Sequence, residues 1–172
     1  MHGEPRLKMN KKIIKVPYFK QKKDYTCGVA SLRMIFKFYN KRISRNLIVK
    51  EAKTEKYKLT KRKDIIVVIK KHEFFGYINE HSSLRELMDF VKKGYPVIIE
   101  YIEPSGDDVH ISIVVGFDKN YIIFNDPWNG KGFRLKQKEF FKRWVINEKG
   151  KGKTRWALVV SKDKIKLQGG KD

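Results

Sequence analysis

The sequence predicts an α+β fold in which a helical N-terminal half precedes an antiparallel β-sheet. Apolar residues recur at three- and four-residue steps through most of residues 27–92, whereas short β-rich runs follow one another from Pro96 onward. This order, without alternating βαβ units, is typical of α+β domains. A length of 172 residues favours one domain. We place a basic N-terminal tail at 1–12, a single domain at 13–161 and a C-terminal tail at 162–172.

The first helix follows an extended segment. Residues 13–19 are expected to be extended because Pro17 excludes a helix there. A loop at 21–24 then leads to a helix over about 27–39, with Thr26 as its N-cap.

Three further helices are expected, and each has a polar capping residue. They are a second helix from Ser44 to about Lys53 with Leu47, Ile48 and Ala52 facing inward, a third at about 61–72 capped by Thr60, and a fourth that begins with a capping box of Ser83 and Glu86 and ends at Gly94.

Strand-forming residues dominate the rest of the chain. The expected extended segments are 73–78, 96–101, 109–117, 121–125 and 156–161, with one more short helix at 139–144.

The composition limits the classes of function. The net charge is +21, of which residues 1–23 contribute +7 and residues 131–172 contribute +10. Such a charge favours an anionic partner, either an acidic substrate, a membrane surface or nucleic acid. The basic residues are mostly scattered lysines without a recognised nucleic-acid motif, so nucleic-acid binding is the weaker alternative.

The sequence also indicates a compartment and the absence of a cofactor. No run approaches the roughly 18 apolar residues of a membrane span, and no apolar stretch precedes Ile13, so a cytoplasmic protein is expected. The single cysteine excludes an internal disulfide. Histidines and the cysteine lack the paired spacing of metal ligands, so neither a metal nor another cofactor is expected.

Cys27 is the candidate nucleophile. It lies at the expected start of the first helix, where free backbone N–H groups and the helix dipole favour a thiolate. A lone cysteine is also often a small buried hydrophobic residue. The assignment therefore depends on its neighbours.

A histidine and an aspartate are expected to lie together on one face of the sheet. Strand alternation places His110 and Ser112 on the same face. If residues 118–120 form a three-residue hairpin loop, Ser112 pairs with Asp126. His110 is then the diagonal neighbour of Asp126, with their backbones roughly 7–8 Å apart. His110 is then a candidate base for the Cys27 thiol, with Asp126 orienting the imidazole.

Gln21 completes the candidate site. It lies six residues before Cys27, where its amide could donate to an oxyanion beside the backbone N–H of Cys27. Each residue has a plain structural alternative: His110 as a core histidine, Asp126 as part of a turn before Pro127, and Gln21 as a surface residue. Their joint placement at element ends favours a catalytic site.

Three blocks of the sequence resemble the C39 peptidases, a family of papain-like cysteine proteases. The blocks are VPYFKQKKDYTCGVASLRMIFKFY, HISIVVGFD and YIIFNDPWNG. The resemblance implies a papain-like fold in which the cysteine helix packs on a C-terminal antiparallel sheet. It also implies Cys27 as nucleophile, His110 as base and acid, Asp126 as orienting residue and Gln21 as oxyanion donor. Members attached to peptide-exporting ABC transporters cut leader peptides after Gly-Gly.

The expected function is therefore hydrolysis of a peptide bond, on a peptide or protein substrate that the charge suggests is acidic. One alternative is a thiol acyltransferase of the transglutaminase type. Another is a non-catalytic binding module for a peptide or an anion. Near the end of the chain, Gly169-Gly170 resembles a Gly-Gly cleavage site and is either part of a tail or a self-processing substrate.

Overall fold

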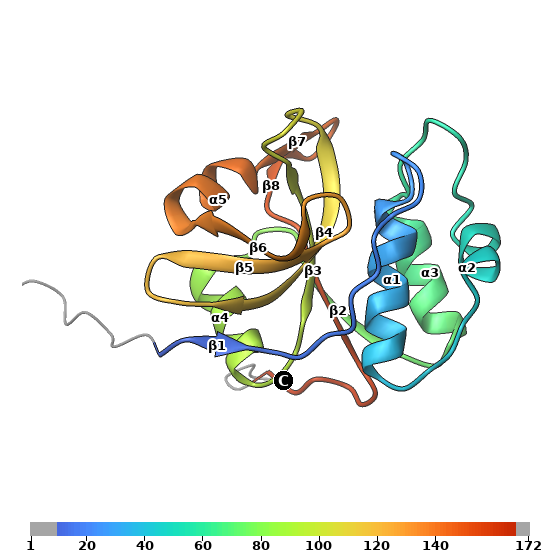
Figure 1. Ribbon diagram of the computed structural model, residues 1–172, viewed down its shortest axis with the longest axis horizontal. Coiled ribbons are helices and arrows are strands. Elements are labelled where there is room, and N and C mark those ends of the chain that lie inside the picture. Colours follow the sequence, from blue (N-terminus) through green and yellow to red (C-terminus); the bar gives the residue numbers. More distant parts are fainter. Residues whose placement is uncertain (1–9, 168–172) are drawn as a thin grey trace, which may run out of the picture.

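A group of three helices lies beside a sheet that the second half of the chain builds (Figure 1). The computed structural model describes residues 10–167. The helical group consists of α1 (Cys27–Phe38), α2 (Arg45–Glu51) and α3 (Arg62–Lys71), and two further helices, α4 (Leu84–Lys92) and α5 (Gln137–Arg143), accompany the sheet. Within the described residues, no helix has both the length and the apolar character needed to cross a membrane.

The sheet is antiparallel at every pairing of its named strands. Its order is β2-β9-β3-β4-β5-β6, with β1 added on β4. The strands are β1 (Lys12–Ile13), β2 (Phe75–Asn79), β3 (Val97–Ile102), β4 (Val109–Phe117), β5 (Tyr121–Asp126), β6 (Gly130–Lys136) and β9 (Ala157–Ser161), and a separate hairpin joins β7 (Ile146–Glu148) to β8 (Gly152–Thr154). The predicted α+β class is thus confirmed.

Helix α1 is central to the fold because it is buried on most of its surface. Nine of its residues, from Cys27 to Phe36, are buried, and the helix packs against β4 as well as α2. Leu32, Met34 and Ile35 have no exposed surface. Since burying an aliphatic side chain stabilises a fold by about 1.5–3 kcal/mol, this packing fixes the position of the first residue of α1, Cys27.

A β-bulge sets the register between β4 and β5. The prediction of a three-residue loop pairs Phe117 with Tyr121, but Phe117 pairs with Ile122 instead. The register then shifts between Val114 and Gly116, and beyond this point Ile113 pairs with Asn125. This is the register that the prediction required near His110. The bulge therefore shifts the register back by the one residue by which the predicted turn was wrong.

The bulge also anchors β1. The carbonyl of the bulged residue, Val115, accepts a hydrogen bond from the Ile14 N–H at 2.7 Å. A Cβ atom on Gly116 would lie only 2.5 Å from the Lys12 carbonyl oxygen. Glycine is required here because the two backbones approach so closely.

Several details of the helix ends differ from the predictions. Ser44 and Ser83 cap α2 and α4 as expected, through the N–H groups of Leu47 and Glu86. The capping box predicted for α4 is incomplete, because the Glu86 carboxylate accepts from Asn79 instead of the Ser83 N–H. Thr26 occupies the N-cap position of α1 without capping it, because its hydroxyl bonds the backbone of Lys23. Thr60 does not cap α3, because its hydroxyl pairs with Thr54, and Lys61 is the N-cap.

Three further differences from the predictions have the same cause, which is the exposure of the residues to solvent. Leu47 was expected to face inward but is 41% exposed, because the short helix α2 buries only the stripe that contains Ile48. Strand β6 was missed because polar and basic residues dominate it, and only Leu135 is buried. The hairpin of β7 and β8 was missed for the same reason.

Arg62 joins the helical group to the sheet and to the β7–β8 hairpin. Its guanidinium forms ion pairs with Glu100 of β3 and Glu148 of β7, and it lies over the Trp156 ring at 5.4 Å. The Arg62 and Glu100 side chains are each only 13% exposed. Removing one partner of such a pair leaves an uncompensated charge in a poorly solvated place.

We expect Arg62→Ala to lower the free energy of unfolding by about 3 kcal/mol, because Glu100 is then left without its partner. Lys63→Ala, at the exposed neighbouring position, should change it by less than about 0.5 kcal/mol. Urea denaturation of the three proteins measures both values. Equal stability of the two variants would contradict the structural role of Arg62.

Candidate active site

Three of the four predicted site residues meet where the first helix contacts the sheet. Cys27 is the first residue of α1, His110 is the second residue of β4, and Asp126 is the last residue of β5. His110 Nε2 donates a hydrogen bond to Asp126 Oδ1 at 2.9 Å. The Cys27 sulfur lies close enough to raise the pKa of His110. With Nε2 bound to Asp126, Nδ1 is the ring nitrogen left for the sulfur.

Asp126 is a fully buried carboxylate that accepts hydrogen bonds from four residues. Besides His110, its Oδ1 accepts from the backbone N–H groups of Trp128 and Asn129 at 2.9 and 2.8 Å. Its Oδ2 accepts from the Tyr101 hydroxyl at 2.8 Å. Burial alone raises the pKa of a carboxyl, but the hydrogen bond and charge of His110 outweigh this, so the pKa of Asp126 is lowered.

The charge of Asp126 affects the pKa of His110. Burial lowers the pKa of His110, but the hydrogen bond to Asp126 and the adjacent Cys27 sulfur overcome that effect and raise the pKa to about 10. The imidazole is therefore held in its cationic form at neutral pH. A cationic imidazole beside a thiol is the electrostatic arrangement that stabilises a thiolate.

Tyr101 is a site residue that the sequence analysis missed. It lies on β3 directly opposite His110, and burial followed by the charge of Asp126 raises the pKa of its hydroxyl. Its ring contacts that of His110 edge to face, with centroids 5.9 Å apart. The only sequence signal is a tyrosine in a β-rich run, because the turn residues at 104–108 predict a loop but not its length, and hence not the register between β3 and β4.

Gln21 lies at the site, but its amide is turned toward its own loop. Its backbone N–H donates to the Pro127 carbonyl at 3.0 Å, which ties this loop to the turn after Asp126. Nε2 donates to the carbonyl oxygens of Lys23 and Asp24 at 2.9 and 3.2 Å. Oε1 is buried without a hydrogen-bond partner among the described residues. Both amide hydrogens therefore already have acceptors in this state.

A cleft of about 850 Å³ opens beside His110 and Gln21. Its walls come from the loop before α1, the loop before α3, the loop between β3 and β4, and the turn after β5. The lining residues are Gln21, Asp24, Tyr25, Tyr57, Leu59, Glu103, Ser105, Gly106, Asp108, Val109, His110 and Trp128. Cys27 is absent from this lining and has no exposed surface, so the sulfur lies behind the cleft.

The chemistry of the cleft contrasts with that of the whole chain. Although the net charge is +21, the cleft is lined by three carboxylates and by no lysine or arginine. Glu103 is satisfied within the protein, since it accepts hydrogen bonds from Ser105, Gly106 and Asn129. Asp24 and Asp108 are exposed. Trp128, 47% exposed, and Tyr57, 82% exposed, offer apolar surface to a ligand.

The described residues include no group of three histidine, cysteine, aspartate or glutamate side chains that could hold a metal ion. His72 has an acidic partner of its own, because its Nε2 lies 2.6 Å from the Glu51 carboxylate. The site at Cys27 thus offers thiol, imidazole and carboxylate chemistry.

Comparison with solved structures shows the same fold in peptidase domains. The peptidase domain of Streptococcus ComA, a bifunctional ABC transporter of a quorum-sensing pathway, aligns over 88% of this chain and 98% of its own, with 23% identity and a TM-score of 0.67. A putative C39-like peptidase from Bacillus anthracis aligns over 90% and 98%, with 17% identity and a TM-score of 0.71.

A third solved structure contains a peptide. It is a double-glycine-motif protease from an AMS/PCAT transporter in complex with the leader peptide, and it aligns over 87% of this chain and 93% of its own, with 19% identity and a TM-score of 0.66. No curated protein matches the chain significantly by sequence. These likenesses agree with the papain-like arrangement expected from the sequence.

The sequence itself matches a family model directly. The description of that family is "Peptidase_C39 like family", and the match spans residues 13–151, which include all four predicted site residues. This match covers most of the chain, and the solved peptidase domains share its fold. The chain therefore belongs to the Peptidase_C39 like family.

Proposed function

We propose that this protein is a cysteine peptidase that hydrolyses a peptide bond through an acyl-enzyme on Cys27. The observation that carries the proposal is the position of His110, between the buried carboxylate of Asp126 and the Cys27 sulfur. The thiolate attacks the scissile carbonyl carbon, and the His110 imidazolium gives its proton to the leaving amine. The imidazole then takes a proton from water, whose oxygen attacks the thioester and releases the carboxylic acid and the Cys27 thiolate, so that the starting thiolate–imidazolium pair is restored.

The oxyanion of the tetrahedral intermediate needs donors at the start of α1. The backbone N–H of Cys27, in the first turn of a helix, is one candidate. The Gln21 amide is the second, and its use requires that Nε2 leaves the carbonyl oxygens of Lys23 or Asp24. We infer that substrate entry opens the loop at 21–26, which exposes the sulfur and frees this amide in the same movement.

The lining of the cleft supports a peptide with basic and aromatic side chains. The expectation of an acidic substrate came from the net charge, but the exposed charges beside His110 belong to Asp24 and Asp108. The transporter protease is described as a double-glycine-motif protease in complex with the leader peptide, and we include cleavage after Gly-Gly by this chain as part of the proposal. Gly169-Gly170 lies outside the described residues.

A non-catalytic peptide-binding module is the second candidate, and one observation favours it. The Cys27 side chain has no exposed surface, and the Gln21 amide is bonded within its loop, so the described state is closed to a substrate. The same cleft would then hold a peptide without cutting it. Acyl transfer to an amine is the third candidate, because the thioester on Cys27 accepts any nucleophile that reaches it.

Incubation with a peptide library containing Gly-Gly sites, followed by mass spectrometry, separates the three candidates. We expect cleavage by the wild type, none by Cys27→Ala or His110→Ala, and a fall in kcat of about a hundredfold or more for Asp126→Asn. His81→Ala, which changes an exposed imidazole, is the matched control and should retain full activity. Peptide binding without products would support the binding module, and transfer of the peptide to an added primary amine in preference to water would reveal an acyltransferase.

The charge of the cleft can be tested without catalysis, in the Cys27→Ala protein. We expect it to bind a Lys-containing Gly-Gly peptide more tightly than a Glu-containing one. Adding Asp24→Asn and Asp108→Asn should reduce that preference about fivefold, since each exposed ion pair contributes only about 0.2–1 kcal/mol. Asp89→Asn with Glu73→Gln removes the same charge from exposed positions outside the cleft. If both double variants lose the same amount of preference for the Lys-containing peptide, the preference comes from the overall charge of the protein and not from the cleft.

The raised pKa of His110 predicts how stability depends on pH. A pKa of about 10 in the folded state exceeds the usual unfolded value of about 6.5. The stabilisation is therefore complete below about pH 6.5 and is lost as the pH rises toward 10. We therefore expect the unfolding free energy of the wild type to fall between pH 6.5 and pH 10. This fall should exceed that of His110→Gln by more than about 1 kcal/mol. Parallel urea-denaturation curves against pH would refute the charged imidazole.

A further inference from the structure

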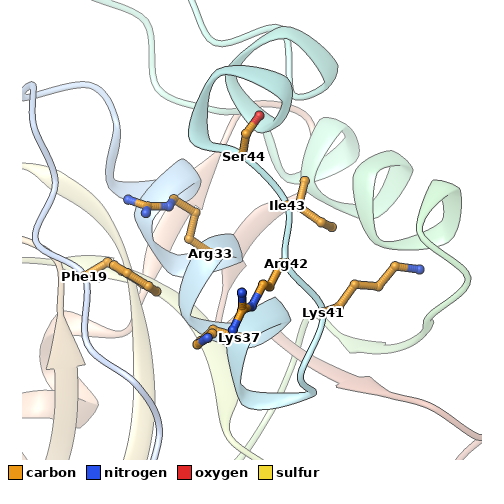
Figure 2. Close-up of a pocket in the computed structure, with 7 residues that line it drawn as sticks. All are labelled: Phe19, Arg33, Lys37, Lys41, Arg42, Ile43 and Ser44. Atoms are coloured by element: carbon orange, nitrogen blue, oxygen red, sulfur yellow. The ribbon is translucent and has the colours of Figure 1, made fainter.

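A second pocket, of about 300 Å³, lies beside α1 and the segment that follows it (Figure 2). Its lining comes from the segment before α1, from α1 itself and from the link between α1 and α2. The lining residues, here called the basic pocket, are Phe19, Arg33, Lys37, Lys41, Arg42, Ile43 and Ser44. Four of these seven residues are cations and none is a carboxylate. The basic pocket shares no residue with the cleft beside His110.

Three of the four cations have no acidic partner. Within residues 10–167, Arg33, Lys37 and Arg42 form no ion pair with a carboxylate. Lys41 differs, because its ammonium donates to the His72 carbonyl at 2.8 Å and lies 3.6 Å from the Glu73 carboxylate. Figure 2 shows the Lys41 side chain directed away from the other three. The unpaired charges therefore gather on one side of the pocket.

The positive charge of Arg33 is in an unfavourable environment. It is partly buried, with its guanidinium carbon 4.1 Å from the centre of the Phe19 ring. Burial, and then the charge of nearby Arg45, lower the pKa of its guanidinium. The Phe19 contact fixes the plane of the guanidinium but brings no negative charge. A bound anion would relieve both the burial and the repulsion.

We propose that the basic pocket binds a phosphate group. A phosphate carries up to two negative charges and several acceptor oxygens, whereas a carboxylate carries one charge and two oxygens. Two guanidinium groups and an ammonium without partners match the phosphate better, because they carry three positive charges and more N–H donors than the two oxygens of one carboxylate can accept. The group belongs either to a small phosphorylated molecule or to a lipid head group, since both present the same chemistry.

The shape of the site distinguishes this ligand from nucleic acid. A duplex is held by cations that follow its backbone and contact many phosphates in series. Here the three unpaired cations lie in the lining of one pocket, together with the apolar side chains of Phe19 and Ile43. Such a lining suits one phosphate group with an organic substituent beside it.

The test uses the full chain and titration calorimetry with inorganic pyrophosphate at constant ionic strength. We expect saturable binding by the wild type and a loss of affinity of about tenfold in Lys37→Gln/Arg42→Gln. Both of these side chains are exposed, so the variant should keep its fold. Lys119→Gln/Lys138→Gln removes the same charge from exposed positions away from the basic pocket and should bind within twofold of the wild type.

Two further probes identify the source of the phosphate. Vesicles of phosphatidylcholine with and without phosphatidylglycerol test for a lipid head group, and a random-sequence DNA duplex tests for nucleic acid. Binding to pyrophosphate or to anionic vesicles that the Lys37/Arg42 variant loses and the control retains supports the proposal and names the source. Absence of binding to both overturns it. An equal loss in both variants, or binding to the duplex alone, overturns it in favour of diffuse attraction to polyanions.

Discussion

The buried carboxylate of Asp126 is the constraint on which the site depends. It has no exposed surface, and it is stable there because it accepts hydrogen bonds from His110, Tyr101, Trp128 and Asn129. These donors come from three strands or turns that meet at one end of the sheet. Leaving a buried charge unpaired is costly, so the same bonds that satisfy Asp126 also fix the imidazole and the turn after β5. The orientation of His110 toward Cys27 follows from them.

The distribution of charge separates two regions of the surface. The chain is strongly basic as a whole, yet the cleft beside His110 is lined by carboxylates and aromatic rings, and the unpaired cations around α1 gather in the basic pocket. An overall charge attracts partners at long range but does not select a site. In our proposals the two sites differ in the ligand that their charges favour. The cleft suits a peptide with basic side chains, and the basic pocket suits a phosphate group.

In the proposed mechanism the loop before α1 has a functional role, because the described state of the site is closed. Gln21 is tied to the turn after Asp126 through its backbone and to its own loop through its amide. Cys27 is covered in the same state. A movement of this loop would change the exposure of the Cys27 sulfur and the direction of the Gln21 amide together. The rigid α1 helix and the Asp126 bonds would keep the cysteine and the histidine in place meanwhile.

The sequence alone determined the fold class, the main helices and central strands, and the identity of the four candidate residues, because hydrophobic periodicity, capping residues and three motif blocks are local properties of the chain. It missed the polar strand β6, whose residues carry no apolar alternation, and it missed the partner role of Tyr101. Only the tertiary structure decided that a bulge at Val115 restores the register near His110, that the Cys27 sulfur is covered, and that carboxylates rather than lysines line the cleft. These features depend on which distant segments pack together, and no local pattern records that packing.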